Sequence, residues 1–282
     1  MNIHPRNHHL AEARIKADAI HVSRGTTGIL HDLSVTIPDA SFTAIVGANG
    51  CGKSTLLMTL ARLLTPKAGE VKLDGVPISE MRPKEFARIV GLMPQTATAP
   101  DGITVSELVP CGRFPYQNAL RLWSRADEEA VARALDLTGM REIATRNVNE
   151  LSGGQRQRAW IAMVLAQETP IIFLDEPTSF LDIAHQIELM TLLENLNRES
   201  GRTIVAVLHD LNQACRFATH MIAMRDGRIV AEGEPGAIMT EELVADVFSL
   251  HAIIASDPVS RTPMVVPRGG LRDTLPKNGE KA

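Results

Sequence analysis

The sequence predicts an α/β fold built on a largely parallel β-sheet that helices cover on both faces. Two observations predict it. In the second half of the chain, short apolar runs alternate with longer helical segments, which is the pattern of parallel strands joined by crossover helices. Nearer the N-terminus, a short apolar run ends in a glycine-rich loop that precedes a helical segment, and such a run is typical of a strand buried on both faces.

Short strands and one helix are predicted before and just after that loop. Alternating apolar and polar residues predict antiparallel strands at Ala19–Val22 and Leu33–Ile37. Phe42–Val46 is apolar throughout and predicts a buried strand, and helical spacing follows at Lys53–Leu64. A strand and turn are expected at Gly69–Gly75. We therefore expect a small antiparallel unit beside the main sheet.

The middle of the chain, from about residue 100 to 158, has helical stretches at Thr104–Leu108 and Ala126–Leu137 and little strand signal. We interpret it as a helical subdomain inserted into the α/β core. The alternation then resumes, with strands at Ile171–Leu174, Thr203–Leu208, Met221–Met224 and Arg228–Ala231 and helices at Ile183–Arg198 and Leu211–Ala218.

The ends of the chain differ from this body. Residues 1–16 are polar and predict a mobile extension, whereas residues 17–266 are long enough for one large domain with its subdomains. Residues 267–282 are rich in glycine, proline and charged side chains, a composition that favours disorder.

Composition excludes several classes of protein. The net charge is −4 and the pI is near 6.1, without the basic stripe of a duplex-binding protein, so no nucleic-acid partner is expected. The cysteines Cys51, Cys111 and Cys215 are too few and too far apart for a disulfide framework. No run approaches the roughly 20 apolar residues that span a bilayer. If the protein works at a membrane, it relies on the helices of a partner.

The glycine-rich loop matches the phosphate-binding pattern G-x-x-x-x-G-K-S between a strand and a helix. Its glycines let backbone N–H groups face phosphate oxygens, and the helix N-terminus favours an anion. Lys53 is expected to reach the β and γ phosphates, Ser54 to ligate Mg²⁺ and Thr55 to contact the α phosphate. The predicted nucleotide cradle comprises Gly47, Ala48, Asn49, Gly50, Cys51, Gly52, Lys53, Ser54 and Thr55.

A pair of carboxylates follows the apolar strand at Ile171–Leu174. The carboxyl ends of parallel strands meet at one edge of a sheet, so Asp175 is expected beside the phosphate loop, where it would serve as a Mg²⁺ ligand. Glu176 comes next, and we predict that it orients and polarises the attacking water.

A second anion-binding segment, the signature segment Leu151–Gln155, reads Leu-Ser-Gly-Gly-Gln. Ser152 is predicted to cap a helix, and Gly153 and Gly154 expose the backbone N–H groups behind it. Together with Gln155, these residues form a second predicted phosphate contact.

With these motifs the chain resembles the ATP-binding subunits of ABC transporters over about residues 18 to 265. The resemblance extends to Gln95, to Leu174–Thr178, to Ser179–Asp182 and to His209. It implies a RecA-like P-loop NTPase core with an antiparallel β subdomain and the helical subdomain specific to this family. It also implies ATP and Mg²⁺ as cofactors.

The resemblance further implies a homodimer in which two copies pack head to tail and enclose two ATP molecules. Ser152 and Gly154 of one copy would bind the γ phosphate held by the other, and Asp182 would contact the opposite site. His209 would hold the γ phosphate and the attacking water, and Gln95 would sense Mg²⁺ and this water. ATP would close the dimer, and hydrolysis would reopen it.

One position departs from the family pattern. Members usually stack the adenine ring on an aromatic side chain near the first strand, where this chain has Arg24. A guanidinium also stacks on bases, so two orientations are open at this stage: Arg24 stacks on adenine, or it points to solvent.

A separate subunit without membrane spans favours an importer, placed at the cytoplasmic face of the inner membrane with permease subunits and a periplasmic or lipoprotein substrate-binding protein. Among importers the chain most resembles those for ferric siderophores and related iron chelates, of the ferric citrate, enterobactin and hydroxamate type. The resemblance lies in Asp101–Val109, Gly112–Pro115, Leu151–Arg158 and Val207–Ala214. Haem and cobalamin importers have similar segments and remain alternatives.

Other ATPase classes fit less well. DNA-repair and chromosome ATPases separate the two phosphate-binding segments by a long coiled coil, whereas about a hundred residues separate them here. Translation-factor ATPases carry two tandem cassettes, and this chain has one P-loop. A binding module without hydrolysis is opposed by the presence of Lys53, Asp175, Glu176 and His209.

Overall fold

The computed structural model describes residues 14–117 and 123–269. These residues form a main sheet of six strands in the order β10-β9-β3-β8-β7-β6, in which β10 alone runs antiparallel to its neighbour. The strands are β3 (Phe42–Gly47), β6 (Val90–Met93), β7 (Ile171–Asp175), β8 (Thr203–Val207), β9 (His220–Arg225) and β10 (Arg228–Gly233). The predicted parallel sheet is confirmed.

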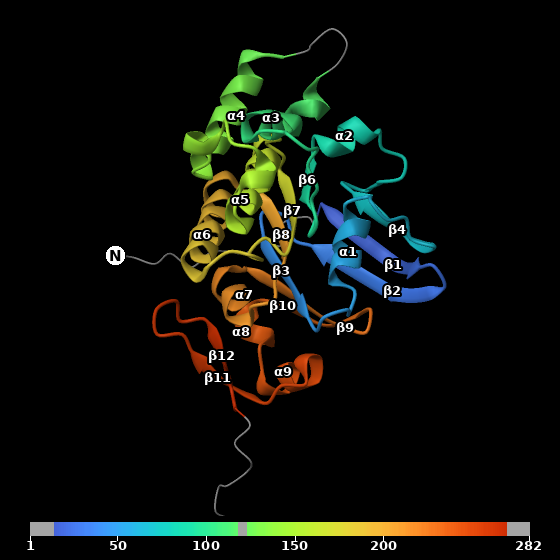
Figure 1. The fold of residues 1–282 in the computed structure, drawn as a ribbon. Coiled ribbons are helices and arrows are strands. Elements are labelled where there is room, and N and C mark those ends of the chain that lie inside the picture. The colour runs from blue at the N-terminus through green and yellow to red at the C-terminus, as the bar shows by residue number, and fades with distance from the viewer. Residues whose placement is uncertain (1–13, 118–122, 270–282) are drawn as a thin grey trace, which may run out of the picture.

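Both faces of this sheet are covered (Figure 1). Successive side chains of a strand point to opposite faces, so Phe42, Ala44 and Val46 pack into one core cluster and Ile45 into the other. The first cluster lies under the helices α5 (Gly153–Ala166), α6 (Ile183–Ser200) and α7 (Leu211–Phe217), and the second lies under α1 (Lys53–Leu60) and the antiparallel sheet.

The antiparallel sheet has the order β2-β1-β4-β5 within the described residues. Its strands are β1 (Ile15–Arg24), β2 (Thr27–Ile37), β4 (Ala68–Leu73) and β5 (Val76–Pro77). Ile15 pairs with Ile37 and Lys16 with Thr36, so these two residues belong to the sheet and not to the extension predicted at 1–16. Ile15 is buried, which explains why the strand begins there.

The helical subdomain gathers at one end of the molecule, away from the antiparallel sheet (Figure 1). It contains α3 (Val105–Leu108), the 3₁₀ helices η1 (Val109–Tyr116), η2 (Arg141–Ile143) and η3 (Val148–Glu150), α4 (Arg125–Leu137) and the start of α5. Because α5 runs to Ala166, the helical part extends beyond the predicted limit of 158.

The other differences from the sequence-based prediction lie at element ends. Helix α1 ends at Leu60, short of the predicted Leu64. A C-terminal hairpin follows the core and had not been predicted. The remaining elements are α2 (Pro83–Ala87), α8 (Pro235–Ile238), α9 (Glu241–Phe248), β11 (Ala252–Ser256) and β12 (Pro263–Pro267). The predicted mobile and disordered tails fall largely outside the described residues.

Candidate nucleotide site

The phosphate loop joins β3 to α1 through backbone conformations that favour glycine. Gly47, Gly50 and Gly52 have φ values of 153°, 77° and 107°, a region that L-residues rarely adopt. A Cβ atom on Gly47 would lie 2.3 Å from the carbonyl oxygen of Met224. Helix α1 begins without a side-chain cap and without an acidic residue in its first turn, so its N-terminal N–H groups face the cleft as free donors for an anion.

The two polar side chains that follow this loop point back into it. The Lys53 Nζ donates hydrogen bonds to the carbonyl oxygens of Gly47 and Ala48, each at 2.9 Å. The Ser54 hydroxyl donates to Asp175 Oδ1, also at 2.9 Å. The predicted contact between the phosphate loop and the carboxylate at the end of β7 is therefore present.

Strand order brings four predicted residues together at the carboxyl edge of the sheet. β3, β8, β7 and β6 are parallel neighbours, so the segments after them emerge side by side. Asp175 is the last residue of β7, His209 follows β8 by two residues, and Gln95 follows β6 by two residues. Lys53 approaches the same edge from α1.

Asp175 is fully buried, and its Oδ2 has no hydrogen-bond partner among the described residues. Burial raises the pKa of Asp175 above its ordinary value, and the hydrogen bond from Ser54 offsets this only in part. A buried anionic oxygen without a partner is unfavourable, so the site is suited to a cation.

Glu176, the next residue, has a left-handed backbone with φ of 54° and a different environment. Its Oε1 lies 2.7 Å from His209 Nε2, and the Ser179 hydroxyl donates to its Oε2 at 3.2 Å. Burial by itself would raise the pKa of Glu176, but hydrogen bonds from His209 and Gln95 outweigh it and hold the pKa below its ordinary value. Glu176 is therefore an ionised acceptor at neutral pH.

Most of these residues line one cleft of about 490 Å³, but Asp175 and the predicted cradle residues Gly47, Ala48 and Cys51 are not part of its lining. His209, Gln95 and Glu176, all predicted from the sequence, lie in its wall together with the second half of the phosphate loop. Its lining residues are Arg24, Ile29, Asn49, Gly50, Gly52, Lys53, Ser54, Thr55, Gln95, Glu176 and His209. Cys51 is buried beneath it and is a free thiol.

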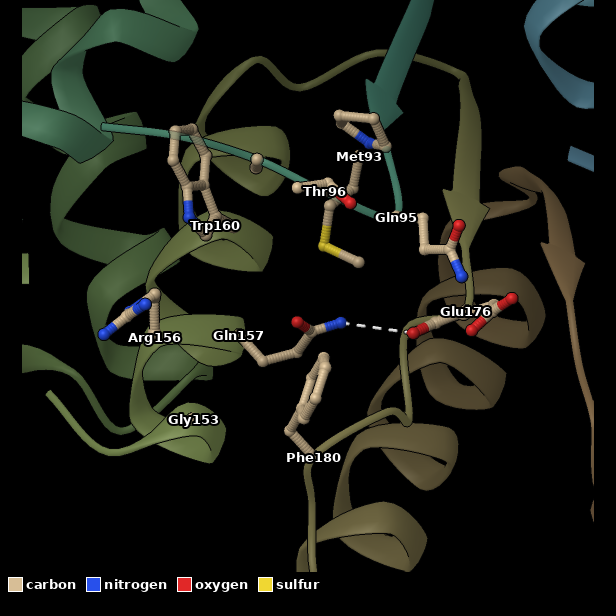
Figure 2. A pocket seen from close by; sticks show the side chains of 11 residues that line it. Met93, Gln95, Thr96, Gly153, Arg156, Gln157, Trp160, Glu176 and Phe180 are labelled. Atoms are coloured by element: carbon tan, nitrogen blue, oxygen red, sulfur yellow. Dashed lines mark hydrogen bonds between the residues drawn. The ribbon is translucent and has the colours of Figure 1, made fainter. Parts of the chain in front are cut away.

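A second cleft of about 460 Å³ lies beside the first, and Gln95 and Glu176 line both. Figure 2 shows it between the segment after β6 and the start of α5. Gln157 reaches from α5 and donates to the backbone carbonyl oxygens of Glu176 at 3.3 Å and Pro177 at 3.1 Å. This contact is not predictable from the sequence, because nothing in the local spacing marks Gln157.

The signature segment forms the start of α5. Ser152 Oγ accepts from the Gln155 N–H, and Gln155 Oε1 accepts from the Ser152 N–H, both at 3.2 Å, which confirms the predicted helix cap. A Cβ atom on Gly153 would lie 3.1 Å from Phe180 Cβ, so the small residue permits close packing. Gly154 is similarly close to the same loop.

The signature segment and Asp182 do not line the cleft of the phosphate loop in the described chain. Asp182 instead caps α6 and accepts from the N–H and the Nδ1 of His185, at 2.9 and 2.8 Å. The two predicted phosphate-binding segments are therefore separate in the described chain, one at the start of α1 and one at the start of α5.

The family model described as ABC transporter matches residues 30–179, which contain the phosphate loop, the signature segment and the paired carboxylates. The chain belongs to the ABC transporter family. None of the helices in the described part of this ABC protein has the length and apolar character to cross a bilayer.

Relatives match over nearly the whole length of the chain. It is 55% identical over 257 residues to the ferric enterobactin transport ATP-binding protein of Escherichia coli (strain K12), covering 91% of this chain and 95% of the relative. It is 51% identical to a probable siderophore transport system ATP-binding protein of Bacillus subtilis (strain 168), covering 90% and 93%. It is 52% identical to the petrobactin import ATP-binding protein FpuD of Bacillus anthracis, covering 88% and 91%.

Solved structures of ABC proteins have the same fold. An inward-facing metal-chelate type ABC transporter, described as putative, superposes with a TM-score of 0.77 at 28% identity, over 91% of this chain and 97% of that one. A dimeric bacterial ABC transporter cassette superposes with a TM-score of 0.70 at 31% identity, over 78% and 98%. The P-loop NTPase core predicted from the sequence is confirmed.

Two side chains from the antiparallel sheet also line the cleft of the phosphate loop. Arg24, at the end of β1, is exposed and lines the cleft of the phosphate loop, which is compatible with the stacking that the sequence left open. Ile29 on β2 lines the same wall and had not been singled out, because an apolar residue in a strand gives no functional signal.

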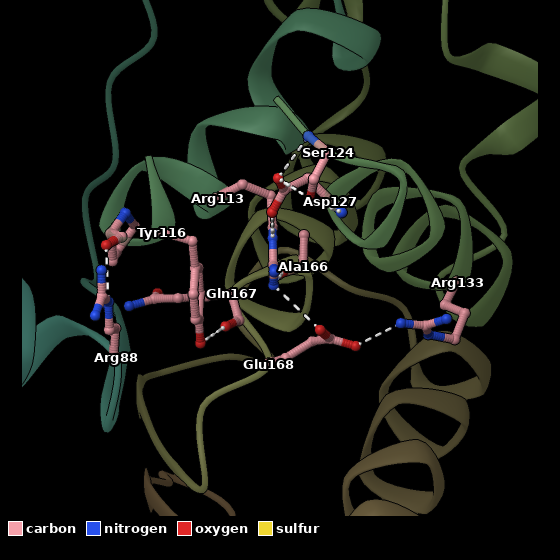
Figure 3. A network of polar contacts seen from close by, with 10 residues as sticks. Arg88, Arg113, Tyr116, Ser124, Asp127, Arg133, Ala166, Gln167 and Glu168 are labelled. Carbon is pink, nitrogen blue, oxygen red and sulfur yellow. Dashed lines mark hydrogen bonds and ion pairs between the residues drawn. The ribbon is translucent and has the colours of Figure 1, made fainter. Parts of the chain in front are cut away.

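A buried ionic network lies in the helical subdomain, at the C-terminal end of α5 (Figure 3). Arg113, only 4% exposed, donates to Asp127 at 2.9 Å, to the Ala166 carbonyl at 2.8 Å and to Glu168 at 3.1 Å. Its guanidinium also lies 4.1 Å from the centre of the Tyr116 ring. The network therefore ties η1 to α4 and to the end of α5.

Proposed function

We propose that this chain is the ATP-hydrolysing subunit of an ABC importer for ferric siderophores or similar iron chelates. The observation that carries the substrate class is the similarity, over nearly the whole chain, to ATP-binding proteins named for enterobactin, siderophore and petrobactin transport. The cleft supports the motor function, because it combines a phosphate loop with an ionised carboxylate and a histidine in contact with it.

In this proposal the phosphates of ATP lie on the backbone of residues 47–52 and on the N-terminus of α1. Lys53 moves from the loop carbonyls to the β and γ phosphates, which offer a stronger, charged acceptor. Glu176 accepts a hydrogen bond from the attacking water and polarises it, while His209 donates to the γ phosphate. Gln95, which follows β6, contacts Glu176 and is placed to sense Mg²⁺ and the attacking water.

Mg²⁺ fits the donor set at the end of β7. The Ser54 hydroxyl and the unpartnered Oδ2 of Asp175 would hold it, together with Gln95, which lines the same cleft as Ser54. Oxygen ligands of this type suit Mg²⁺, and the ion, when bound, neutralises charge on the phosphates. In its absence Asp175 remains a buried carboxylate beside Ser54.

The partners proposed are a second copy of this chain, a membrane permease and a substrate-binding protein acting through that permease. A dimer is supported by the separation of the signature segment from the cleft in the described chain and by the dimeric state of a solved relative. Such a complex would hold this subunit on the cytoplasmic face of the inner membrane.

Contact with the permease is proposed at the helical subdomain. Phe114 is 63% exposed and directly follows Arg113, whose side chain is fixed by the buried network (Figure 3). An exposed aromatic residue on a rigid support is typical of an interface anchor. We propose that Phe114 contacts the permease and that the network transmits force to α5.

The test is uptake of radioactive iron from a panel of siderophores and ferric citrate, in cells that lack this chain. We expect wild type to restore uptake of one chelate or chelate class, and Glu176→Gln not to restore it. If no iron chelate responds but haem or cobalamin uptake does, the substrate class is wrong while the motor function remains. Restoration by Glu176→Gln at the wild-type rate would contradict the catalytic role of Glu176.

A further inference from the structure

The segment Glu176–Asp182, which we call the carboxylate loop, begins with the proposed water-polarising residue and ends with the cap of α6. Its internal hydrogen bonds are few and long. Ser179 N–H donates to the Glu176 carbonyl at 3.2 Å, and Leu181 N–H donates to the Thr178 carbonyl at 3.4 Å. Regular secondary structure therefore does not fix this loop.

The loop also contains strained backbone. Glu176 and Phe180 have φ values of 54° and 66°, a left-handed conformation that costs a non-glycine residue about 1–2 kcal/mol. Such conformations persist only where the surroundings over-determine them. Contacts from outside the loop must therefore supply the constraint.

Two glutamine side chains supply it. A primary amide carries two N–H donors, so one glutamine can hold two carbonyl groups. Gln157 on α5 holds the carbonyls of Glu176 and Pro177 (Figure 2). Gln186 on α6 holds those of Thr178 at 3.2 Å and Leu181 at 3.0 Å.

A third glutamine links this arrangement to the histidine. Gln213 on α7 is 8% exposed and donates to Gln186 Oε1 at 2.6 Å. The N–H of Gln213 is capped by Asp210 at 3.0 Å, and Asp210 directly follows His209. His209 also contacts Glu176. The contacts therefore form a closed ring that runs from His209 through α7 and Gln213 to Gln186, and from Gln186 through the carboxylate loop back to Glu176.

We propose that Gln157, Gln186 and Gln213 form an amide relay that positions Glu176 and Asp182 relative to His209 and the signature helix. The proposal rests on the proposed function, because its effect is read as ATP hydrolysis. None of the three touches the P-loop cleft, so they are positioning residues and not catalytic ones. A displacement of α5 or α7 would reach Glu176 through its backbone.

The test compares glutamine-to-leucine variants of the full chain by ATP turnover, KM for ATP and melting temperature. We expect Gln157→Leu, Gln186→Leu and Gln213→Leu to lower kcat by about tenfold or more, because misplacement of a reacting group by about 1 Å costs up to a hundredfold. KM should stay at the wild-type value, since no contact with the nucleotide is removed. The Gln186→Leu, Gln213→Leu double variant should lose no more than the larger single loss.

Stability distinguishes this role from a merely structural one. Gln213→Leu removes the hydrogen bond to Gln186, but it also removes Gln213 Oε1, a buried acceptor without a partner among the described residues. Because the two effects offset each other, the melting temperature should stay near that of wild type while kcat falls. Asn197→Leu is the matched control: Asn197, on the same helix as Gln186, also holds two carbonyls, those of Ala40 and Arg202, at the opposite edge of the sheet. It should lose stability and keep wild-type kcat.

Three sets of results would overturn the relay. Wild-type kcat in the glutamine variants, or an equal loss in Asn197→Leu, would show that the amides do not position the site. Additive losses in the double variant would show that Gln186 and Gln213 act separately. Absence of turnover in wild type, or normal turnover in Glu176→Gln, would overturn the proposed function and with it the relay.

Discussion

Asp175 and Glu176 are adjacent in sequence, yet their surroundings give them opposite properties. Asp175 is buried with one oxygen unpartnered, and burial raises its pKa. Glu176 is held by His209, Gln95 and Ser179, and its pKa stays low in spite of its burial. One carboxylate is prepared for a cation, and the other for a hydrogen-bond donor such as water.

For Asp175 we predict a trade between stability and function. Asp175→Asn should raise the free energy of unfolding of the ligand-free protein by about 1–3 kcal/mol, because it replaces a buried unpaired charge by a neutral group of the same shape. It should also abolish the additional stabilisation by MgATP over ATP with EDTA. Thermal unfolding with and without each ligand measures both effects, and a destabilised variant that still responds to Mg²⁺ would contradict the assignment.

For Lys53 the predicted effect is on binding. Lys53→Ala leaves the phosphates without their point charge, and ATP affinity should fall by at least tenfold, about 1.4 kcal/mol. Titration with a fluorescent ATP analogue measures it. Lys67→Ala, which removes an exposed lysine outside the cleft, is the control and should bind as wild type.

At the scale of elements, the buried network of Arg113 decides how the helical subdomain is held together. Asp127 is 1% exposed. Burial would raise its pKa, but hydrogen bonds from Ser124 and Arg113 outweigh it and hold the pKa below its ordinary value. A carboxylate of this kind stabilises the fold above its unfolded pKa, and the contribution is lost as the pH falls through the folded pKa.

Arg113→Met should therefore be strongly destabilising, by about 3–5 kcal/mol at neutral pH, because Asp127 is left as a buried charge without its cation. Acidification should shrink the difference from wild type, since protonation relieves Asp127 in the variant and weakens the pair in wild type. Urea unfolding at a series of pH values measures this. Arg125→Met, which breaks an exposed pair with Glu129, should cost less than about 1 kcal/mol at every pH.

In the molecule as a whole, the two predicted phosphate-binding segments of one chain lie on different helices and do not share a cleft among the described residues. Two chains packed head to tail would bring them together. This arrangement couples nucleotide occupancy to association, because each bound ATP would complete its site only against the second copy.

We expect Glu176→Gln to form a stable dimer in MgATP and a monomer without nucleotide, because ATP binding is intact while hydrolysis is blocked. Sedimentation velocity measures this. Ser152→Ala in the same background should weaken the dimer, although its lost helix cap also costs about 1 kcal/mol of stability. If Glu176→Gln stayed monomeric at saturating MgATP, that result would contradict the head-to-tail model.

Features that depend on local spacing could be predicted from the amino-acid sequence alone. The phosphate loop, the paired carboxylates, the capped signature segment and the alternation of strands and helices all follow from neighbouring residues, whose conformations constrain one another directly. From these came the fold class and the family resemblance. The start of β1 at Ile15 and the C-terminal hairpin were missed, since short strands near chain ends have weak local signals.

Which of these segments contact one another is known from the folded chain. The strands β8, β7 and β6 are neighbours in the sheet but far apart in the chain, so the contact of His209 with Glu176 and the convergence of Gln95 could not be worked out from spacing alone. The same holds for Gln157 and Gln213, whose amides look like ordinary polar residues in the sequence. Their partners lie on other helices and loops, and hydrogen bonds between such distant segments are set by packing of the folded chain.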